Sequence, residues 1–433
     1  INKQALSDFM IAGTVSEGNT FFENIKYLKP GNFFEVILNQ KMQSPKSFTS
    51  RKNYLKIKDK KSESQYVEEI YQILKENVNL RVKGDKEVGV YFSGGLDSAL
   101  ILALYRDIFP TKNIKTFTAS FEVIDDDKLT GEHDRAEAMA KFLNCDNKIA
   151  RVSSDTVLKS IGTYSQPCDS FLNVTNHSLA KESKKNNVEV ILSGEGSDEM
   201  FFGYDHHLAV ISQFKKNYSY LSKKYKFRGE YIKNIKLSES KIDDLFLGGG
   251  VDIDLNNNRE SIFTEEILKT ISYKTIIKKI INSFNLKNPD DVEQIIVMLD
   301  YYLKVPELLV RRAEGPSMDT GVEARFPYLD VDLINLLYSV PLEMKVGKKI
   351  EDKYLLRTIA KKLIPDKFLV PKTPFGNPAV QTEHFKSAGV KFKEPAFKTF
   401  FFKNNSIMKD EILNGKFSKL NLFNKNIKVE NIK

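Results

Sequence analysis

The pattern of apolar and polar residues between positions 88 and 192 predicts alternating strands and helices. Short apolar runs, typical of buried strands, alternate with longer segments in which apolar residues recur every three or four positions. The expected strands are 88–92, 115–121 and 188–192, and the expected helices are 98–108, 134–143 and 179–186. This order indicates βαβ units, so we predict an α/β fold with a doubly wound parallel sheet.

The chain before this region has a different pattern. Residues 2–11 read as a helix, and short strands are expected on both sides of a turn at Pro30-Gly31. A Lys- and Ser-rich linker at 52–64 leads into an amphipathic helix at 65–80. Its apolar face consists of Val67, Ile70, Leu74 and Val78.

After position 204 the pattern becomes mostly helical. We expect a long helix at 290–312, bent at Pro306, and an ordered turn followed by a helix within 321–340. Residues 391–433 are rich in Lys with scattered Phe, so we expect a basic tail that is loosely attached or partly disordered.

Composition narrows the class of protein. The chain has 433 residues, of which 41% are hydrophobic and 28% charged, enough for two globular domains. The net charge of +9 suits an anionic partner, and because Lys is spread along the chain we expect a nucleotide substrate rather than nucleic acid. Cys145 and Cys168 form no CxxC pair, which predicts a reducing, cytoplasmic setting. No apolar run approaches the length of a membrane span.

The first candidate for chemistry is the loop SGGLDS at 93–98, between a predicted strand and a predicted helix. Its glycines allow a tight turn and close approach to a ligand, and the following helix directs its N-terminus at the site, so we interpret the loop as a phosphate cradle. No Lys follows the second Gly, which argues against a Walker-type loop. Asp97 beside phosphate suggests a Mg²⁺ ligand, while the alternative is an ordinary turn in which Asp97 or Ser98 caps the helix.

A second loop, SGEGSD at 193–198, follows another predicted strand. Both loops lie at carboxyl ends of parallel strands, so they are expected to share one nucleotide. Asp198 would join Asp97 on the metal, and Glu195 could act as a base. The alternative is that Glu195, Asp198 and Glu199 complement the helix dipole, which is the favoured interpretation for Glu199.

The combination of motifs resembles a known family. SGGLDS resembles the PP-loop of the ATP pyrophosphatases, and together with LSGEGSDEMFFGY, GVEARFPYLD and DKYLLR it resembles the synthetase domain of glutamine-dependent asparagine synthetases. The resemblance covers roughly 65–385, and TFFENIKYLKPGNF resembles the end of that family's glutaminase domain. It implies a glutaminase remnant at 1–58, an ATP-binding synthetase domain at 65–390 and the tail at 391–433.

The resemblance implies an adenylation reaction with ATP and Mg²⁺. A carboxylate substrate would attack the α-phosphorus, pyrophosphate would leave, and ammonia would convert the acyl-adenylate into an amide. Glu195 and Lys353 are the implied catalytic residues, and Asp97 and Asp198 the implied metal ligands. The implied ATP and pyrophosphate contacts are Ser93, Gly94, Gly95, Leu96, Asp97, Ser98, Ala119, Ser193, Gly194 and Lys372. Glu323 and Arg325 match a motif of the family. Contact with the substrate and a structural ion pair that holds the turn are equally good interpretations of this match.

Two departures from the family bear on function. The family's N-terminal Cys nucleophile has no counterpart before Cys145, so we expect this chain to use free ammonia. Relatives commonly carry Asp-Arg or a Lys where this chain has Glu314, Gly315 and Pro316, which leaves the identity of the acid open.

Several functions therefore stay open. Aspartate is the first choice of acid, and the alternative is an amidotransferase acting on a sugar acid or surface-polysaccharide precursor, or one that closes a β-lactam-type ring. A tRNA-modifying PP-loop enzyme would carry a basic arm and often paired cysteines, and a binding-only protein would lack the loop carboxylates. The expected partners are a small carboxylate and ammonia, with no membrane and no nucleic acid, and a homodimer is a further option.

Overall fold

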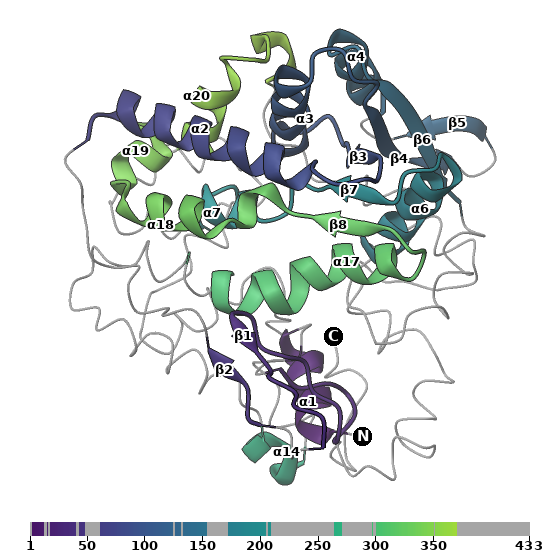
Figure 1. The fold of residues 1–433 in the computed structure, drawn as a ribbon, viewed down its shortest axis with the longest axis vertical. Coiled ribbons are helices and arrows are strands. Elements are labelled where there is room, and N and C mark those ends of the chain that lie inside the picture. Colours follow the sequence, from purple (N-terminus) through teal and green to yellow (C-terminus); the bar gives the residue numbers. More distant parts are fainter. Residues whose placement is uncertain are drawn as a thin grey trace. The chain divides into compact units, whose positions relative to one another are not determined.

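In the computed structural model (Figure 1), the chain folds into two compact units. One unit contains Ile1–Ile57, Tyr225–Leu308 and Phe401–Lys433, and the other contains Lys58–Lys224 and Leu309–Phe400. The structure describes residues 2–12, 15, 18–39, 43–47, 61–123, 126–130, 133–153, 172–204, 207–208, 264–270, 297, 300–349 and 351–369. Each unit is considered by itself.

A six-stranded sheet forms the centre of the second unit. Its strands are β3 (Val88–Tyr91), β4 (Lys115–Val123), β5 (Asp126–Thr130), β6 (Asp146–Val152), β7 (Val190–Leu192) and β8 (Glu323–Arg325). Five strands run parallel in the order β6-β4-β3-β7-β8, and β5 pairs antiparallel with β4. The strand order reverses between β3 and β7. Ligands of open α/β sheets bind at such a reversal, outside the carboxyl ends of the strands.

Helices cover both faces of this sheet, as predicted for a doubly wound fold. Above it in Figure 1 lie α2 (Glu63–Arg81), α3 (Leu96–Ile108) and α4 (His133–Phe142), and below it lie α6 (Leu172–Lys185) and α17 (Val310–Met318). An apolar cluster that includes Phe117, Leu179, Ala180 and Ile191 joins the sheet to α6. The predicted α/β fold class is therefore confirmed.

The first helix of this unit illustrates how local sequence sets a boundary. The pattern predicted a start at Gln65, whereas α2 begins at Glu63. The reason is a capping box, in which the Ser62 hydroxyl accepts from the Gln65 N–H and the Gln65 side chain accepts from the Ser62 N–H. The predicted apolar face is confirmed, because Val67, Ile70, Leu74 and Val78 are all buried.

Several elements differ from the sequence-based expectation, and one of them, the antiparallel strand β5, has no predicted counterpart. The strand β6 was not predicted, because its sequence DNKIARV lacks a continuous apolar run, yet it pairs with β4 from Asp146 to Val152. The short strand β8 was read as part of a turn. Helix α6 begins at Leu172 rather than at 179, because its polar first turns are buried and Asn176 Nδ2 donates to the Arg312 carbonyl oxygen of α17 at 2.8 Å.

The remaining described elements of this unit follow the second half of the sheet. They are α7 (Ser197–Met200), the 3₁₀ turn η4 (Pro327–Leu329), α18 (Val331–Ser339), α19 (Leu342–Val346), α20 (Tyr354–Ala360) and the 3₁₀ turn η5 (Asp366–Phe368). The expected turn and helix within 321–340 correspond to η4 and α18. Where a bent helix at 290–312 was expected, residues 300–309 form a π-helix, η3 (Asp300–Leu309), which contains Pro306 and, except for Leu309, belongs to the first unit, whereas α17 belongs to this unit.

The first unit has few described elements. They are α1 (Lys3–Ala12), β1 (Asn32–Phe33), β2 (Lys46–Ser47), α14 (Glu265–Thr270) and the π-helix η3, and β1 pairs antiparallel with β2. The predicted N-terminal helix is confirmed by α1, and Gly31 adopts a φ of 70° in the predicted turn. Ala5, Val15 and Phe21 form a small core.

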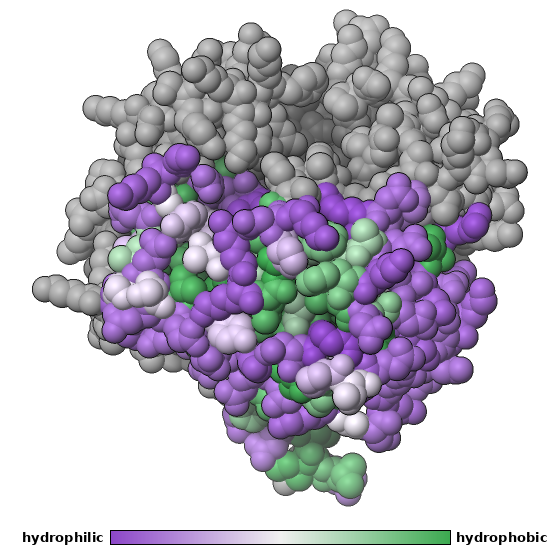
Figure 2. Space-filling view, turned by 90° about the horizontal axis from the view of Figure 1, so that it is seen from above, coloured by the Kyte–Doolittle hydropathy of each residue, from purple (hydrophilic) through white to green (hydrophobic). Residues whose placement is uncertain are grey.

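The surface seen in Figure 2 carries hydrophilic residues around a smaller group of hydrophobic ones. Within the described part of the chain, no helix is both long and apolar enough to cross a membrane. The basic tail at 391–433 and Lys372 lie outside the described residues, so the predictions for them stay predictions.

Candidate active site

The loop after β3 is a compact turn built from small residues. The Ser93 N–H donates to Ser98 Oγ at 3.3 Å, and the Gly95 N–H donates to Ser93 Oγ at 3.1 Å. Gly94 has a φ of 71°, and a Cβ at this position would lie 2.9 Å from the Ala136 nitrogen. Both observations show that a tight turn with a glycine is required here.

Helix α3 begins directly after this turn. Its N-cap residue is Gly95, with no side-chain capping hydrogen bond, so Asp97 and Ser98 do not serve as the N-cap. The first N–H groups of a helix have no partners within it and carry partial positive charge. The turn and the helix start together could act as an anion cradle at the carboxyl end of β3.

The second loop meets the first, as the sequence predicted. A Cβ on Gly194 would lie 3.1 Å from Asp97 Cβ, so the two loops are in close contact at this glycine. The Ser193 N–H donates to the Arg325 carbonyl oxygen at 2.9 Å, which ties the loop to β8. Gly196, with a φ of 92°, is the N-cap of α7, again without a side-chain cap.

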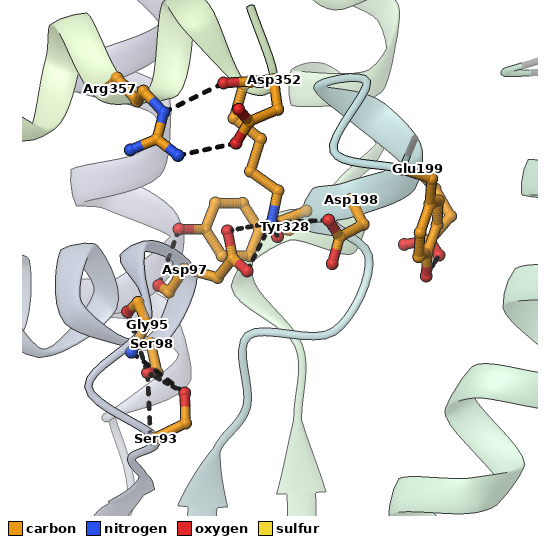
Figure 3. Close-up of polar contacts among 12 residues, drawn as sticks. Ser93, Gly95, Asp97, Ser98, Asp198, Glu199, Tyr328, Asp352 and Arg357 are labelled. Carbon is orange, nitrogen blue, oxygen red and sulfur yellow. Dashed lines mark hydrogen bonds and ion pairs between the residues drawn. The ribbon is translucent and has the colours of Figure 1, made fainter. Parts of the chain in front are cut away.

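Lys353 joins the two loops. Its ammonium nitrogen lies 2.5 Å from Asp97 Oδ2, 2.8 Å from Asp198 Oδ1 and 3.2 Å from Ser197 Oγ. Figure 3 shows the side chains of Asp97 and Asp198 pointing toward this shared nitrogen. The Lys353 side chain is only 3% exposed, whereas those of Asp97 and Asp198 are 24% and 21% exposed. The two carboxylates are therefore partly exposed, whereas the ammonium group is buried.

The Asp97 and Asp198 carboxylates stabilise the charged form of Lys353. Burial alone would lower the pKa of Lys353, but the carboxylates of Asp198 and Asp97 outweigh it and raise that pKa above its ordinary value. Lys353 is thus a permanent cation between two carboxylates.

This donor set fits Mg²⁺. Mg²⁺ is usually held by one or two carboxylates together with substrate phosphates and water. Asp97 and Asp198 supply two carboxylates beside this candidate anion cradle. Among the residues that the structure describes, no group of three or more His, Cys, Asp or Glu could hold a metal ion without such help.

Lys353 is placed by the segment EDKYLLR. It is the N-cap of α20 and adopts a left-handed backbone conformation with a φ of 52°. Asp352 before it is buried and binds Arg357, whose Nη2 donates to Asp352 Oδ2 at 2.7 Å and whose Nε donates to the Asp352 carbonyl oxygen at 3.1 Å (Figure 3). These two hydrogen bonds from Arg357 stabilise the turn that directs Lys353 into the site.

Gly203 packs directly against the cluster. A Cβ at this position would overlap both Asp198 Oδ1 and Lys353 Cε. The Gly203 N–H also donates to the Asp198 carbonyl oxygen at 2.8 Å. Only glycine leaves room for the ion pair between Asp198 and Lys353.

Glu195 has an unusual acidity. Desolvation raises its pKa to about 7, and nearby Asp198 and Asp97 act in the same direction, while Arg312 and Lys353 oppose the shift. A carboxylate with a pKa near neutrality can accept a proton and later release it. Glu195 therefore has the acidity expected of a general base.

Glu199 has a different environment from its neighbours. It is buried and accepts a hydrogen bond from the Tyr204 hydroxyl, and in Figure 3 it lies apart from Asp97 and Asp198. This placement supports a structural role, as the sequence favoured.

Ala119 lies on β4 beyond the end of β3. The Phe92 N–H donates to the Phe117 carbonyl oxygen at 2.8 Å, so the main-chain groups of Phe117 face β3. Because these groups alternate sides along a strand, those of Ala119 point the same way, past the end of β3. The loop at 93–98 leaves the sheet at this end of β3.

The pair Glu323 and Arg325 lies on β8. Arg325 Nε donates to Glu323 Oε1 at 2.7 Å, and Arg325 Nη1 donates to the carbonyl oxygens of Arg81 and Lys83 at 2.7 and 3.2 Å. These contacts hold the end of α2 against the sheet, which supports the structural interpretation of the pair. Glu314 and Gly315 are exposed on α17.

Several residues at the site were missed by sequence reasoning. Ser197, Gly203, Tyr328, Asp352 and Arg357 all lie inside the quoted motifs, and Tyr328 donates from its hydroxyl to the Asp97 carbonyl oxygen at 2.9 Å. The only sign in the sequence that these residues matter is that they lie within these motifs. Their roles depend on contacts between distant segments, which the motifs alone do not give.

Comparison with known proteins agrees with the motifs. A family model described as asparagine synthase matches residues 69–396. Asparagine synthetase (glutamine-hydrolyzing) 1 of Bacillus subtilis (strain 168) is 26% identical over 393 residues, covering 85% of this chain and 58% of that protein. Amidase chyE of Penicillium rubens is 22% identical over 396 residues, covering 81% of this chain and 58% of that protein. The chain thus spans under two thirds of the length of these relatives.

Among solved structures, one similar chain is the NH3-dependent NAD synthetase from Campylobacter jejuni. It shares 14% sequence identity with this chain at a TM-score of 0.26, and the match covers 59% of this chain and 97% of that one.

Proposed function

The chain belongs to the asparagine synthase family, and from this premise we propose that it is an ATP-dependent, amide-forming ligase. In this proposal the enzyme adenylates a carboxylate substrate with release of pyrophosphate, and ammonia then displaces AMP. The family match supports an amide-forming reaction over the modification of tRNA. A cytoplasmic location and a homodimer stay predictions.

The observation that carries the proposal is the meeting of Asp97, Asp198 and Lys353 at the reversal of strand order. One cation and two carboxylates stand beside the anion cradle of 93–98. No Lys follows Gly95 within this loop, so the loop itself lacks the clamp of a γ-phosphoryl transferase. The arrangement suits a pyrophosphate leaving group bound to the loop.

The first step forms the acyl-adenylate. An oxygen of the substrate carboxylate attacks the α-phosphorus of ATP, the bond between the α-phosphorus and the bridging oxygen breaks, and pyrophosphate takes the electron pair. The N–H groups of the cradle and the Ser93 and Ser98 hydroxyls would bind pyrophosphate. Lys353 would stabilise the negative charge that develops on the phosphates. When bound by Asp97 and Asp198, Mg²⁺ would supply further neutralisation of phosphate charge.

The second step forms the amide. Ammonia attacks the carbonyl carbon of the adenylate, AMP leaves with the electron pair of the acyl–oxygen bond, and the nitrogen must lose a proton. Glu195, ionised above a pKa of about 7, would accept this proton. Adenine would be recognised by the main-chain groups of Ala119, which point past the end of β3.

Aspartate is the proposed acid, with asparagine as the product. A second candidate is another carboxylic acid, and two observations favour keeping it. The Penicillium relative carries the name of an amidase, and the exposed Glu314 and Gly315 stand where the family commonly has other residues. Both candidates share the adenylation chemistry and differ only in the pocket for the acid.

The test is pyrophosphate release from ATP and Mg²⁺ in the presence of ammonium and a panel of carboxylic acids. The proposal expects release that depends on one acid, with aspartate first among them. Release with a different acid would correct the substrate and leave the mechanism. No acid-dependent release across the panel would contradict the ligase proposal, and full turnover by Asp97→Ala would contradict the metal-ligand assignment.

A further inference from the structure

The motif GVEARFPYLD reaches the active site through its second half. Its first half, with Glu323 and Arg325, is bound to the end of α2 as described above. The following turn η4 instead places two consecutive residues, Tyr328 and Leu329, against the two loops of the site. The reaction proposed above does not use this turn.

Tyr328 contacts the first loop. Its hydroxyl donates to the Asp97 main-chain carbonyl oxygen at 2.9 Å, and its ring is fully buried with an edge-on contact to Phe201 (Figure 3). Asp97 lies in the first turn of α3, and its side chain binds Lys353. The hydroxyl therefore restrains the backbone that carries one of the two carboxylates.

Leu329 contacts the second loop. A Cβ on Gly196 would overlap Leu329 Cδ2, so the backbone of the second loop lies directly on this side chain. Gly196 is the N-cap of α7, whose first turn carries Asp198. One turn of chain thus touches the backbone next to each carboxylate.

The turn itself is anchored to a rigid element. From α2, Asn77 Nδ2 donates to the Pro327 carbonyl oxygen at 3.2 Å, and Arg81 Nη2 lies 3.2 Å from Asp330 Oδ2. Asn77 is buried and Arg81 is half-buried. The long helix α2 therefore fixes η4 on both sides of Tyr328 and Leu329.

We propose that η4 sets the spacing of the two loops and that Tyr328 is a positioning residue for the Asp97 carboxylate. The inference rests on the proposed function, because the spacing of Asp97 and Asp198 matters when both meet the pyrophosphate of ATP. Tyr328 touches neither ATP nor the acid in this account. It acts through Asp97 alone.

The experiment compares Tyr328→Phe with Tyr105→Phe. Tyr105 is a matched control, because its buried hydroxyl also donates to a main-chain carbonyl oxygen, that of Val88, at 3.2 Å. It lies eight residues further along α3 than Asp97, about 12 Å away along the helix axis. Binding of inorganic pyrophosphate with Mg²⁺ is measured by calorimetry, together with the melting temperature of each variant.

Both variants lose one buried hydrogen bond, so we expect similar falls in melting temperature. Only Tyr328→Phe should bind Mg²⁺-pyrophosphate more weakly, by about three- to tenfold, the loss expected for one hydrogen bond. Leu329→Ala, which loosens the other side of the turn, should also weaken this binding.

Wild-type affinity in both Tyr328→Phe and Leu329→Ala would overturn the inference and leave the proposed function standing, provided that the wild type binds pyrophosphate and turns over. An equal loss of affinity in Tyr105→Phe would also overturn it, because the effect would then be general destabilisation. A wild-type protein that binds no Mg²⁺-pyrophosphate would remove the proposed function and the inference with it.

Discussion

The ammonium nitrogen of Lys353 lies 2.5 Å from Asp97 Oδ2, although 256 residues separate them in the chain. The same nitrogen lies 2.8 Å from Asp198 Oδ1. Three segments must therefore fold together before the Lys353 cation can meet both carboxylates. The loop at 93–98 supplies one carboxylate, the second loop another, and the turn before α20 the cation.

Replacing Lys353 by Met tests the role of this cation. The change leaves two neighbouring carboxylates without their buried counter-charge and removes the group that would stabilise the reacting phosphates. We expect acid-dependent pyrophosphate release to fall about 10²- to 10³-fold. The matched control is Lys362→Met, because Lys362 pairs with Glu68 at the surface. Activity of Lys353→Met within tenfold of the control would contradict the assignment.

The pH dependence of the amide-forming step tests Glu195. Its pKa is raised to about 7, so it is protonated below this pH and ionised above it. A general base must be ionised to accept a proton. The rate of the step should therefore be highest above pH 7 and fall about tenfold for each pH unit below it. Glu195→Gln measured at the same pH values controls for the ionisation of ammonia itself. The same profile in both proteins would show that another group is titrating.

The raised pKa of Glu195 also affects stability. Whereas the rate of the amide-forming step should rise with pH, the stability of the fold should fall. The folded state binds the Glu195 proton more tightly than the unfolded chain, whose ordinary pKa is 4.5. The stability contributed by the neutral carboxyl is therefore fully present below pH 4.5 and is lost as the pH rises through 7. Denaturant unfolding of the wild type and Glu195→Gln at several pH values measures this difference, which should grow toward pH 7.

Gly203→Ala tests the close packing around the ion pair. The added methyl group would overlap Asp198 Oδ1 and Lys353 Cε, so both side chains must move. We expect the affinity for Mg²⁺-ATP to fall by tenfold or more, about 1.4 kcal/mol. Gly315→Ala is the matched control, because no atom lies within 4 Å of a Cβ there. In a helix this control should be neutral or stabilising by up to about 1 kcal/mol. Equal affinities in the two variants would argue against the packing account.

Arg325→Met separates the two interpretations of the pair on β8. The contacts of Arg325 with the Arg81 and Lys83 carbonyl oxygens predict a loss of stability of about 1–3 kcal/mol, with little change in the KM for the acid. A substrate contact predicts the reverse, a raised KM and an almost unchanged melting temperature. Denaturant unfolding and steady-state kinetics on the same preparation decide between them.

The sequence predicted those parts of the fold that are determined by local patterns. The apolar runs of β3 and β7 and the face of α2 were correct because burial of one side of an element appears directly as periodicity. The strand β6 was missed because its residues are polar and alternate irregularly, and its pairing partner β4 lies about 30 residues earlier. The sequence predicts too short a helix α6 because polar residues such as the half-buried Asn176 look like loop residues until their partner is known.

The candidate site shows the same division. Asp97, Asp198 and Lys353 were each found from a motif, and the structure brings them together. The importance of Gly203 and Tyr328 could not be predicted, because it depends on distances between segments that are far apart in the chain. The roles assigned to the site residues in the reaction stay proposals.

The most direct test of the central claim follows an oxygen atom. If the substrate carboxylate attacks the α-phosphorus of ATP, an acid labelled with oxygen-18 in its carboxyl group transfers one labelled oxygen to AMP when ammonia forms the amide. Phosphorus NMR of the products should therefore show labelled AMP and unlabelled pyrophosphate. Unlabelled AMP, or ADP with labelled phosphate, would contradict the adenylation mechanism.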